Sequence, residues 1–133
     1  MVADEGISQH FALAARTEAP KPQMNRLEMA YADRLETLKS AKEIIHYEYE
    51  PLTLRLSQHN QRLGYTPDFI VINKEGQIEA HEVKGFWREA AVQRLKKASE
   101  QFWWIRFKSA ERPRVKDPWT IREWPKAWAE VAV

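Results

Sequence analysis

Asp68, Glu82 and Lys84 stand near the ends of two segments, residues 66–73 and 78–85, that a short turn separates. Alternating apolar and polar side chains within these segments predict two antiparallel strands. If the turn joins them as a regular hairpin, Asp68 lies directly opposite Glu82, and Lys84 follows on the same face. Both strands then change from apolar to charged at the same end.

Two neighbouring carboxylates on a buried face repel each other, so they need a compensating cation or a shared proton. Lys84 supplies one positive charge, and a divalent cation would supply more. Ligands that are all oxygen suit hard cations, and Mg²⁺ is typically held by one or two carboxylates with waters and substrate phosphate. This pairing depends on the register, because a slip by one residue turns one strand's charges to the other face. The alternative is a surface hairpin whose Glu82 and Lys84 are solvated and whose Asp68 follows a turn proline.

The elements around this hairpin predict one α/β domain with the order α-β-β-β-α-β. Residues 24–39 have a helical stripe of apolar side chains, with Glu28 at its border. Period-two alternation over 45–56 predicts one strand bent at Pro51, or two short strands. A helix is expected over 87–101 and a strand over the aromatic run 102–107. A helix between two strands of one sheet favours a right-handed crossover.

The two ends of the chain carry weaker patterns. Residues 1–23 are expected to form a partly mobile arm, with a short helix over 8–16 and two prolines after it. Residues 24–108 are expected to form the core. In the tail, 109–133, Trp119, Trp124 and Trp128 either cover an exposed sheet edge or form a dimer patch.

The composition excludes several classes of protein. The chain has 133 residues, which is enough for one core, and no cysteine, which excludes disulfides and thiolate zinc sites. Neither a transmembrane run nor a secretory signal is visible in the sequence, so we expect a cytoplasmic protein with no membrane partner.

Charge is distributed unevenly along the chain. Residues 84–116 hold ten basic and three acidic side chains, whereas the remainder holds 11 basic and 16 acidic ones. Such asymmetry suggests a polyanionic partner at one surface.

Pro67-Asp68 followed by Glu82-Val83-Lys84 resembles the motif of the PD-(D/E)XK nuclease superfamily, whose restriction-endonuclease-like core is also α-β-β-β-α-β. The resemblance spans 24–107. It implies an Mg²⁺-dependent phosphodiesterase in which Asp68, Glu82 and the Val83 carbonyl bind the metal, with Mn²⁺ able to substitute. Lys84 would position the attacking water, and Glu28 would be a further catalytic acid. Carboxylate-held metal ions can indeed activate water and neutralise a leaving alkoxide.

The resemblance is closest in style to small phage-encoded members. It implies a DNA endonuclease, with branched DNA such as Holliday junctions as the leading substrate and host cytoplasm as its location. A homodimer is a further expectation, because resolvases usually cut two strands symmetrically. Gly-rich phosphate loops are absent, so no nucleotide cofactor is expected. Two rivals remain: a non-catalytic nucleic-acid-binding module on the same fold, and an interaction or packaging accessory protein.

Polar side chains that follow Lys84 could contact the DNA backbone. They are Arg88, Gln93, Arg94, Lys96 and Lys97, and an ordinary solvated helix face explains them about equally well. Trp87 could stack on a base, although packing is the more common fate of a tryptophan. His81 is expected to point to the opposite face and to be packed or hydrogen-bonded rather than a metal ligand.

Overall fold

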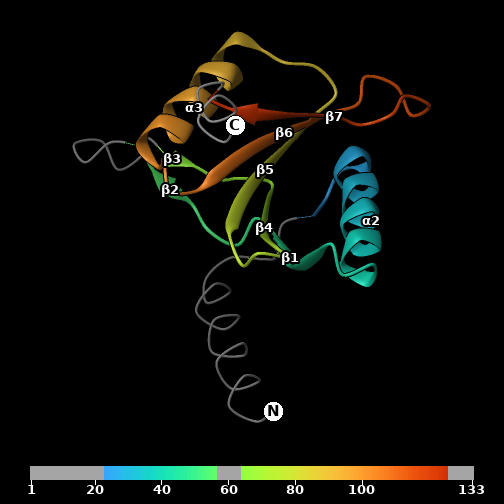
Figure 1. Cartoon of the computed structure of the whole chain (residues 1–133). Coiled ribbons are helices and arrows are strands. Elements are labelled where there is room, and N and C mark those ends of the chain that lie inside the picture. Colours follow the sequence, from blue (N-terminus) through green and yellow to red (C-terminus); the bar gives the residue numbers. More distant parts are fainter. Residues whose placement is uncertain (1–22, 57–63, 126–133) are drawn as a thin grey trace.

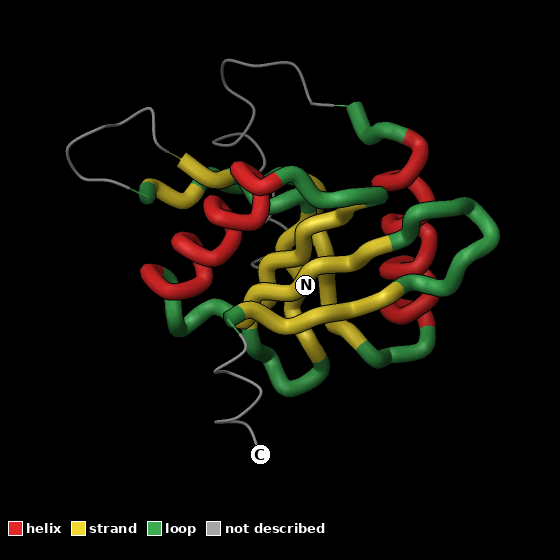
Figure 2. The backbone as a smooth tube through the Cα atoms, turned by 90° about the horizontal axis from the view of Figure 1, so that it is seen from above, coloured by secondary structure: helices red, strands yellow, loops and turns green. Residues whose placement is uncertain are grey.

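Two helices lie on opposite faces of a five-stranded mixed sheet in residues 23–56 and 64–125, the parts of the chain that this computed structural model describes (Figures 1 and 2). The helices are α2 (Arg26–Ser40) and α3 (Glu89–Gln101). The sheet has the order β1-β4-β5-β6-β7. Its strands are β1 (Ile44–Tyr49), β4 (Phe69–Asn73), β5 (Ile78–Lys84), β6 (Arg106–Glu111) and β7 (Thr120–Trp124). A second, two-stranded sheet joins β2 (Leu54–Arg55) to β3 (Gly64–Tyr65).

The predicted α/β class is confirmed. β1, β4 and β5 are antiparallel neighbours, and β6 runs parallel to β5 after the crossover through α3. Apart from the small sheet and β7, the order along the chain is the expected α-β-β-β-α-β. The hairpin register is also confirmed, since Ile72 pairs with Ile78 and Ile70 with Ala80.

Helix α2 begins with a capping box. The Asn25 side chain accepts a hydrogen bond from the Glu28 backbone, and the Glu28 carboxylate accepts one from the Asn25 backbone. Two backbone donors that have no partner within the helix are thereby satisfied. The predicted apolar stripe then buries Tyr31 and Leu35 against the sheet.

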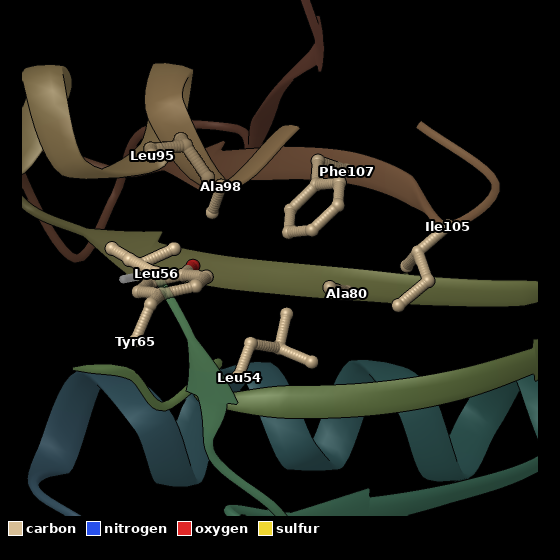
Figure 3. Close-up of a cluster of buried hydrophobic side chains, with 8 residues drawn as sticks. All are labelled: Leu54, Leu56, Tyr65, Ala80, Leu95, Ala98, Ile105 and Phe107. Atoms are coloured by element: carbon tan, nitrogen blue, oxygen red, sulfur yellow. The ribbon is translucent and has the colours of Figure 1, made fainter. Parts of the chain in front are cut away.

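The sheet separates two hydrophobic clusters. One lies between α2 and the sheet and includes Phe69, Val71 and Val83. The other lies between α3, the small sheet and the opposite face (Figure 3), and consists of Leu54, Leu56, Tyr65, Ala80, Leu95, Ala98, Ile105 and Phe107. Because β-strand side chains alternate, β5 contributes Val83 to the first cluster and Ala80 to the second.

The strand expected over 102–107 begins later than predicted, at Arg106. Helix α3 ends at Gln101, and the following residues turn, with the Ile105 N–H donating to the Phe102 carbonyl. A strand over 102–107 would bury at least one of Trp103 and Trp104, but both lie in this turn and are 64% and 58% exposed, so that expectation is wrong. The need to reverse the chain after the helix overrides the β propensity of these aromatic residues.

The alternation over 45–56 resolves into two short strands, the second of the two alternatives. A register shift between Ile44 and His46 leaves Ile45 56% exposed, although its alternation with Tyr47 predicts a buried position. Glu50 then adopts φ 44°, which turns the chain into Pro51. A bulge of this kind changes the face to which a side chain points.

The C-terminal segment joins the sheet. Strand β6 ends at Glu111, and β7 pairs with it along its whole length, so β7 adds a fifth strand to the sheet. Trp124 on β7 therefore helps to cover the edge of β6, in agreement with the first alternative for the tryptophans. Trp128 and the helix expected over 8–16 lie outside the described residues. Neither described helix is long and apolar enough to cross a bilayer.

Candidate metal-binding site

The hairpin brings Asp68 and the end of β5 to the same edge of the sheet. The β4–β5 pairing ends at Phe69 and His81, so Asp68 lies one residue beyond it. There Oδ2 of Asp68 accepts a 2.8 Å hydrogen bond from the backbone N–H of Val83. The aspartate side chain thus accepts the hydrogen bond that a backbone carbonyl would accept if the β4–β5 pairing continued.

Glu82 is buried, 8% exposed, and each of its carboxylate oxygens has a partner. The Tyr65 hydroxyl donates to Oε1 at 2.9 Å, and Nζ of Lys84 lies 3.1 Å from Oε2. Tyr65 comes from β3, whose small sheet packs beside α3. Sequence reasoning missed Tyr65, because no local pattern links a two-residue strand to the end of β5. The only signal available was its place two residues before Pro67 in the motif.

The electrostatics of Asp68 show that one lysine does not compensate two carboxylates. Burial and then the charge of Glu82 raise the pKa of Asp68 to about 8, and Glu28 adds to this effect. The Val83 N–H and the Lys84 ammonium oppose the rise. Burial and the Glu82 charge also raise the pKa of Tyr65, so its hydroxyl stays a hydrogen-bond donor. The pair is therefore short of positive charge at neutral pH.

Glu28 lies near this pair but has structural partners of its own. It is buried, and its Oε1 accepts from the Asn25 backbone at 2.9 Å and from the Tyr49 hydroxyl at 3.0 Å. Two other acids on or near α2, Glu36 and Glu43, are engaged by Tyr47 and Lys74. A catalytic part for Glu28 stays a prediction.

Oxygen atoms that could ligate a hard cation are present at the edge of both β4 and β5. Within an extended strand the N–H and C=O of one residue point to the same edge, so the Val83 carbonyl points toward the Asp68 side, as its N–H does. The Lys84 carbonyl points the other way and accepts from Arg112. Among the described residues, no three acidic, histidine or cysteine side chains gather closely enough to hold a metal ion by themselves. The oxygen atoms that could ligate a cation here are therefore those of Asp68, Glu82 and one backbone carbonyl. Such a set would leave positions for water and substrate, as Mg²⁺ sites usually do.

The polar residues predicted on α3 are exposed. Gln93, Arg94, Lys96 and Lys97 face solvent while Leu95 and Ala98 are buried. The Arg94 guanidinium partly offsets the rise in the pKa of Tyr65, so its charge acts on the hydroxyl that contacts Glu82. Gln93 donates to Glu89 on its own helix at 3.0 Å.

Trp87 packs against the rest of the protein, which is the more common of the two alternatives for a tryptophan. Its indole N–H donates to Glu111 at 2.6 Å, and its ring lies 6.1 Å from that of Trp124. The exposed aromatic residue beyond Lys84 is Phe86, 71% exposed, with the Arg88 guanidinium 5.9 Å from its ring centre. Sequence reasoning missed Phe86, although its position directly after Gly85 was a signal that it leaves the strand.

His81 points to the opposite face from Glu82, as predicted. It is buried, with the Tyr31 hydroxyl 2.6 Å from Nδ1 and the Glu79 carboxylate 2.8 Å from Nε2. Burial lowers the pKa of His81, although Glu79 opposes the change. His81 is therefore part of the packing beneath α2.

The arrangement defines an α/β protein with an acidic hairpin edge: two carboxylates, an ammonium group and a backbone carbonyl at the end of the central strands. Comparisons with protein-family models, curated proteins and solved structures find no match to this chain. A functional assignment must therefore rest on the site itself.

Proposed function

We propose that this chain is an Mg²⁺-dependent DNA endonuclease of the PD-(D/E)XK type that works in the cytoplasm. The observation that carries the proposal is the meeting of Asp68 with the buried Glu82, where burial and then the Glu82 charge raise the pKa of Asp68 to about 8 despite the adjacent Lys84. A divalent cation between them would remove that repulsion. Groups with strongly shifted pKa values cluster at functional sites, which supports a ligand-binding role for this edge.

Each residue has a chemical task in this proposal. Bound Mg²⁺ would lower the pKa of a coordinated water and polarise the phosphate. Asp68 and Glu82 hold the cation, and the Tyr65 hydroxyl fixes the orientation of the Glu82 carboxylate. The Lys84 ammonium, 32% exposed, orients the water and stabilises charge on the phosphate oxygens.

Charge supports a nucleic-acid substrate. Exposed basic residues lie on α3, the helix that follows the strand carrying Lys84, and the charge of Arg94 acts on the Tyr65 hydroxyl beside Glu82. Contacts of this kind position a phosphate backbone without reading its sequence. We propose branched DNA as the preferred substrate and a homodimer as the active form.

The experiment is a cleavage assay on plasmid, linear duplex, single-stranded and four-way-junction DNA, with Mg²⁺, Mn²⁺ or EDTA. We expect cleavage that needs the metal and that Asp68→Asn and Lys84→Ala each reduce by about a hundredfold or more. Glu75→Gln and Lys74→Ala, in the exposed turn at the far end of the same hairpin, serve as matched controls and should cleave normally.

Metal-dependent cleavage that both site variants retain would reject the site. Salt-sensitive DNA binding by the wild-type protein without any cleavage would favour the non-catalytic binding module. Light scattering that detects only monomer, with and without DNA, would reject the dimer.

A further inference from the structure

A pocket of about 270 Å³ opens on the α2 face of the sheet, toward the β4–β5 turn. β5 contributes Glu79 and His81 to this pocket, whereas Ala80 and Glu82 point to the other face of the sheet. The pocket is therefore separate from the carboxylate pair proposed to bind metal. Its volume corresponds to roughly nine water molecules at liquid density, enough for a small organic anion.

The floor of the pocket is a closed hydrogen-bond network around Glu79. Asn73 donates to this carboxylate at 2.9 Å, His81 lies 2.8 Å from it, and Nζ of Lys108 lies 3.3 Å away. These partners bring the pKa of Glu79 down to about 2 although burial alone would raise it. The negative charge of Glu79 is thus already compensated, and it does not repel an anion as an isolated carboxylate would.

Charged groups of both signs line the rest of the pocket. Lys108 and Arg106 come from β6, Arg34 comes from α2, and Lys74 comes from the turn, and the carboxylates of Glu43 and Glu75 line it as well. Arg106 is paired with Glu123 at 2.6 Å, and Lys74 with Glu43 at 3.6 Å.

Arg34 differs from the other cations of the pocket. In 23–56 and 64–125 no carboxylate forms an ion pair with it. Burial raises the pKa of Tyr31, and the Arg34 guanidinium opposes this rise, which places Arg34 beside the Tyr31 hydroxyl at the pocket. A guanidinium in this position offers several donors to one ligand.

Part of the pocket lining is apolar. It includes Leu38 from α2, Ile44 from β1 and Ile121 from β7. A pocket with one apolar wall and a few convergent polar groups is the usual form of a small-molecule site.

We propose that this pocket binds a small phosphomonoester. Its phosphate contacts Arg34 and Lys108, and its organic part lies along Leu38 and Ile121. The planar fork of an arginine matches phosphate oxygens in pairs, which favours phosphate over a ligand that offers one lone acceptor. A nucleoside monophosphate combines a charged end with a flat base whose faces are apolar and can lie against aliphatic side chains.

The test is calorimetric titration of the full chain, in EDTA, with inorganic phosphate, deoxyadenosine monophosphate and a short DNA duplex. EDTA keeps divalent metal away from Asp68 and Glu82. We expect saturable binding of the nucleotide and weaker binding of phosphate. Arg34→Ala should weaken nucleotide binding by about tenfold or more, since it removes charged hydrogen bonds. Arg34→Lys should weaken it less.

Arg26→Ala, an exposed arginine of the same helix outside the pocket, is the matched control and should bind normally. Because the titration excludes divalent metal and measures binding rather than cleavage, this site can stand if the nuclease proposal falls. No saturable binding of nucleotide or phosphate, or binding that Arg34→Ala leaves unchanged, would overturn the proposal. So would binding of the duplex alone, because that indicates a backbone contact on the surface.

Discussion

The Val83 N–H donates to Oδ2 of Asp68 across 2.8 Å, at the point where the backbone pairing of β4 and β5 has ended. This bond holds one carboxylate against the strand that carries Glu82 and Lys84. It does so without cancelling the repulsion between the two acids, because the pKa of Asp68 stays near 8. The hairpin edge therefore holds the two carboxylates together without enough positive charge to neutralise both.

The first prediction concerns the pH dependence of stability. The pKa of Asp68 rises from its usual 3.8 to about 8 on folding, so the folded state binds the proton more tightly between these values. The free energy of unfolding should therefore fall as pH rises from about 4 to 8, when metal is absent. Asp68→Asn cannot ionise and should lack this decline. Melting temperatures at acidic and alkaline pH in EDTA measure it, and parallel curves for both proteins would contradict it.

A second prediction is that Mg²⁺ stabilises the wild-type protein at alkaline pH. A ligand at a hundred times its dissociation constant adds about 2.7 kcal/mol to the free energy of unfolding. For a chain of this size that is a rise of several degrees in melting temperature. Glu82→Gln should abolish the rise, and Glu75→Gln should keep it. An equal rise in the two variants would show that the cation binds elsewhere.

Tyr65→Phe should weaken metal binding without removing a metal ligand. The variant loses the hydroxyl that donates to Glu82 at 2.9 Å, and a lost outer partner of this kind typically costs 10–100-fold in metal affinity. The Mg²⁺ concentration for half-maximal cleavage should rise by about that factor, with the rate largely recovered at saturating Mg²⁺. A lower rate at every Mg²⁺ concentration with the half-maximal point unchanged would assign Tyr65 another role.

Glu79 should stabilise the fold at neutral pH but not in acid. Its folded pKa of about 2 lies below its usual 4.5, so its contribution is present above that value and is lost as pH falls toward 2. Glu79→Ala leaves Asn73, His81 and Lys108 without their acceptor and should cost about 3 kcal/mol at pH 7. Urea denaturation at several pH values measures the difference, which should shrink in acid. A constant difference would contradict the ionic role.

An aromatic residue in the turn after α3 and one in the following strand β6 should differ sharply in their contribution to stability. Phe107 is 1% exposed, so Phe107→Ala should cost about 3–5 kcal/mol. Trp103 is 64% exposed, and Trp103→Ala should change stability by about 0.5 kcal/mol or less. Urea denaturation compares the two. A large loss in the Trp103 variant would show that this side chain packs in solution.

Local patterns predicted much of the fold and the centre of the site. The stripe that buries Tyr31 and Leu35, and the alternation that sets Ile70 against Ala80, arise from neighbours a few residues apart in the chain. Helix and strand periods are properties of such neighbours, so the sequence alone carried them. Asp68 and Glu82 follow at the same edge because a short turn fixes the hairpin register.

Contacts between distant segments decided the rest. The Tyr65 hydroxyl reaches Glu82, and Arg34 lies beside Tyr31 and β5, through the packing of separate elements. The rise in the pKa of Asp68 depends on burial, and the spacing of residues along the sequence does not show which side chains are buried. The turn that exposes Trp103 and the bulge that exposes Ile45 likewise depend on how the chain must continue into the sheet.

The sequence by itself determined which residues alternate and which charges stand at strand ends. Only the tertiary structure decided which of them are buried together, because desolvation and long-range contacts exist only after packing.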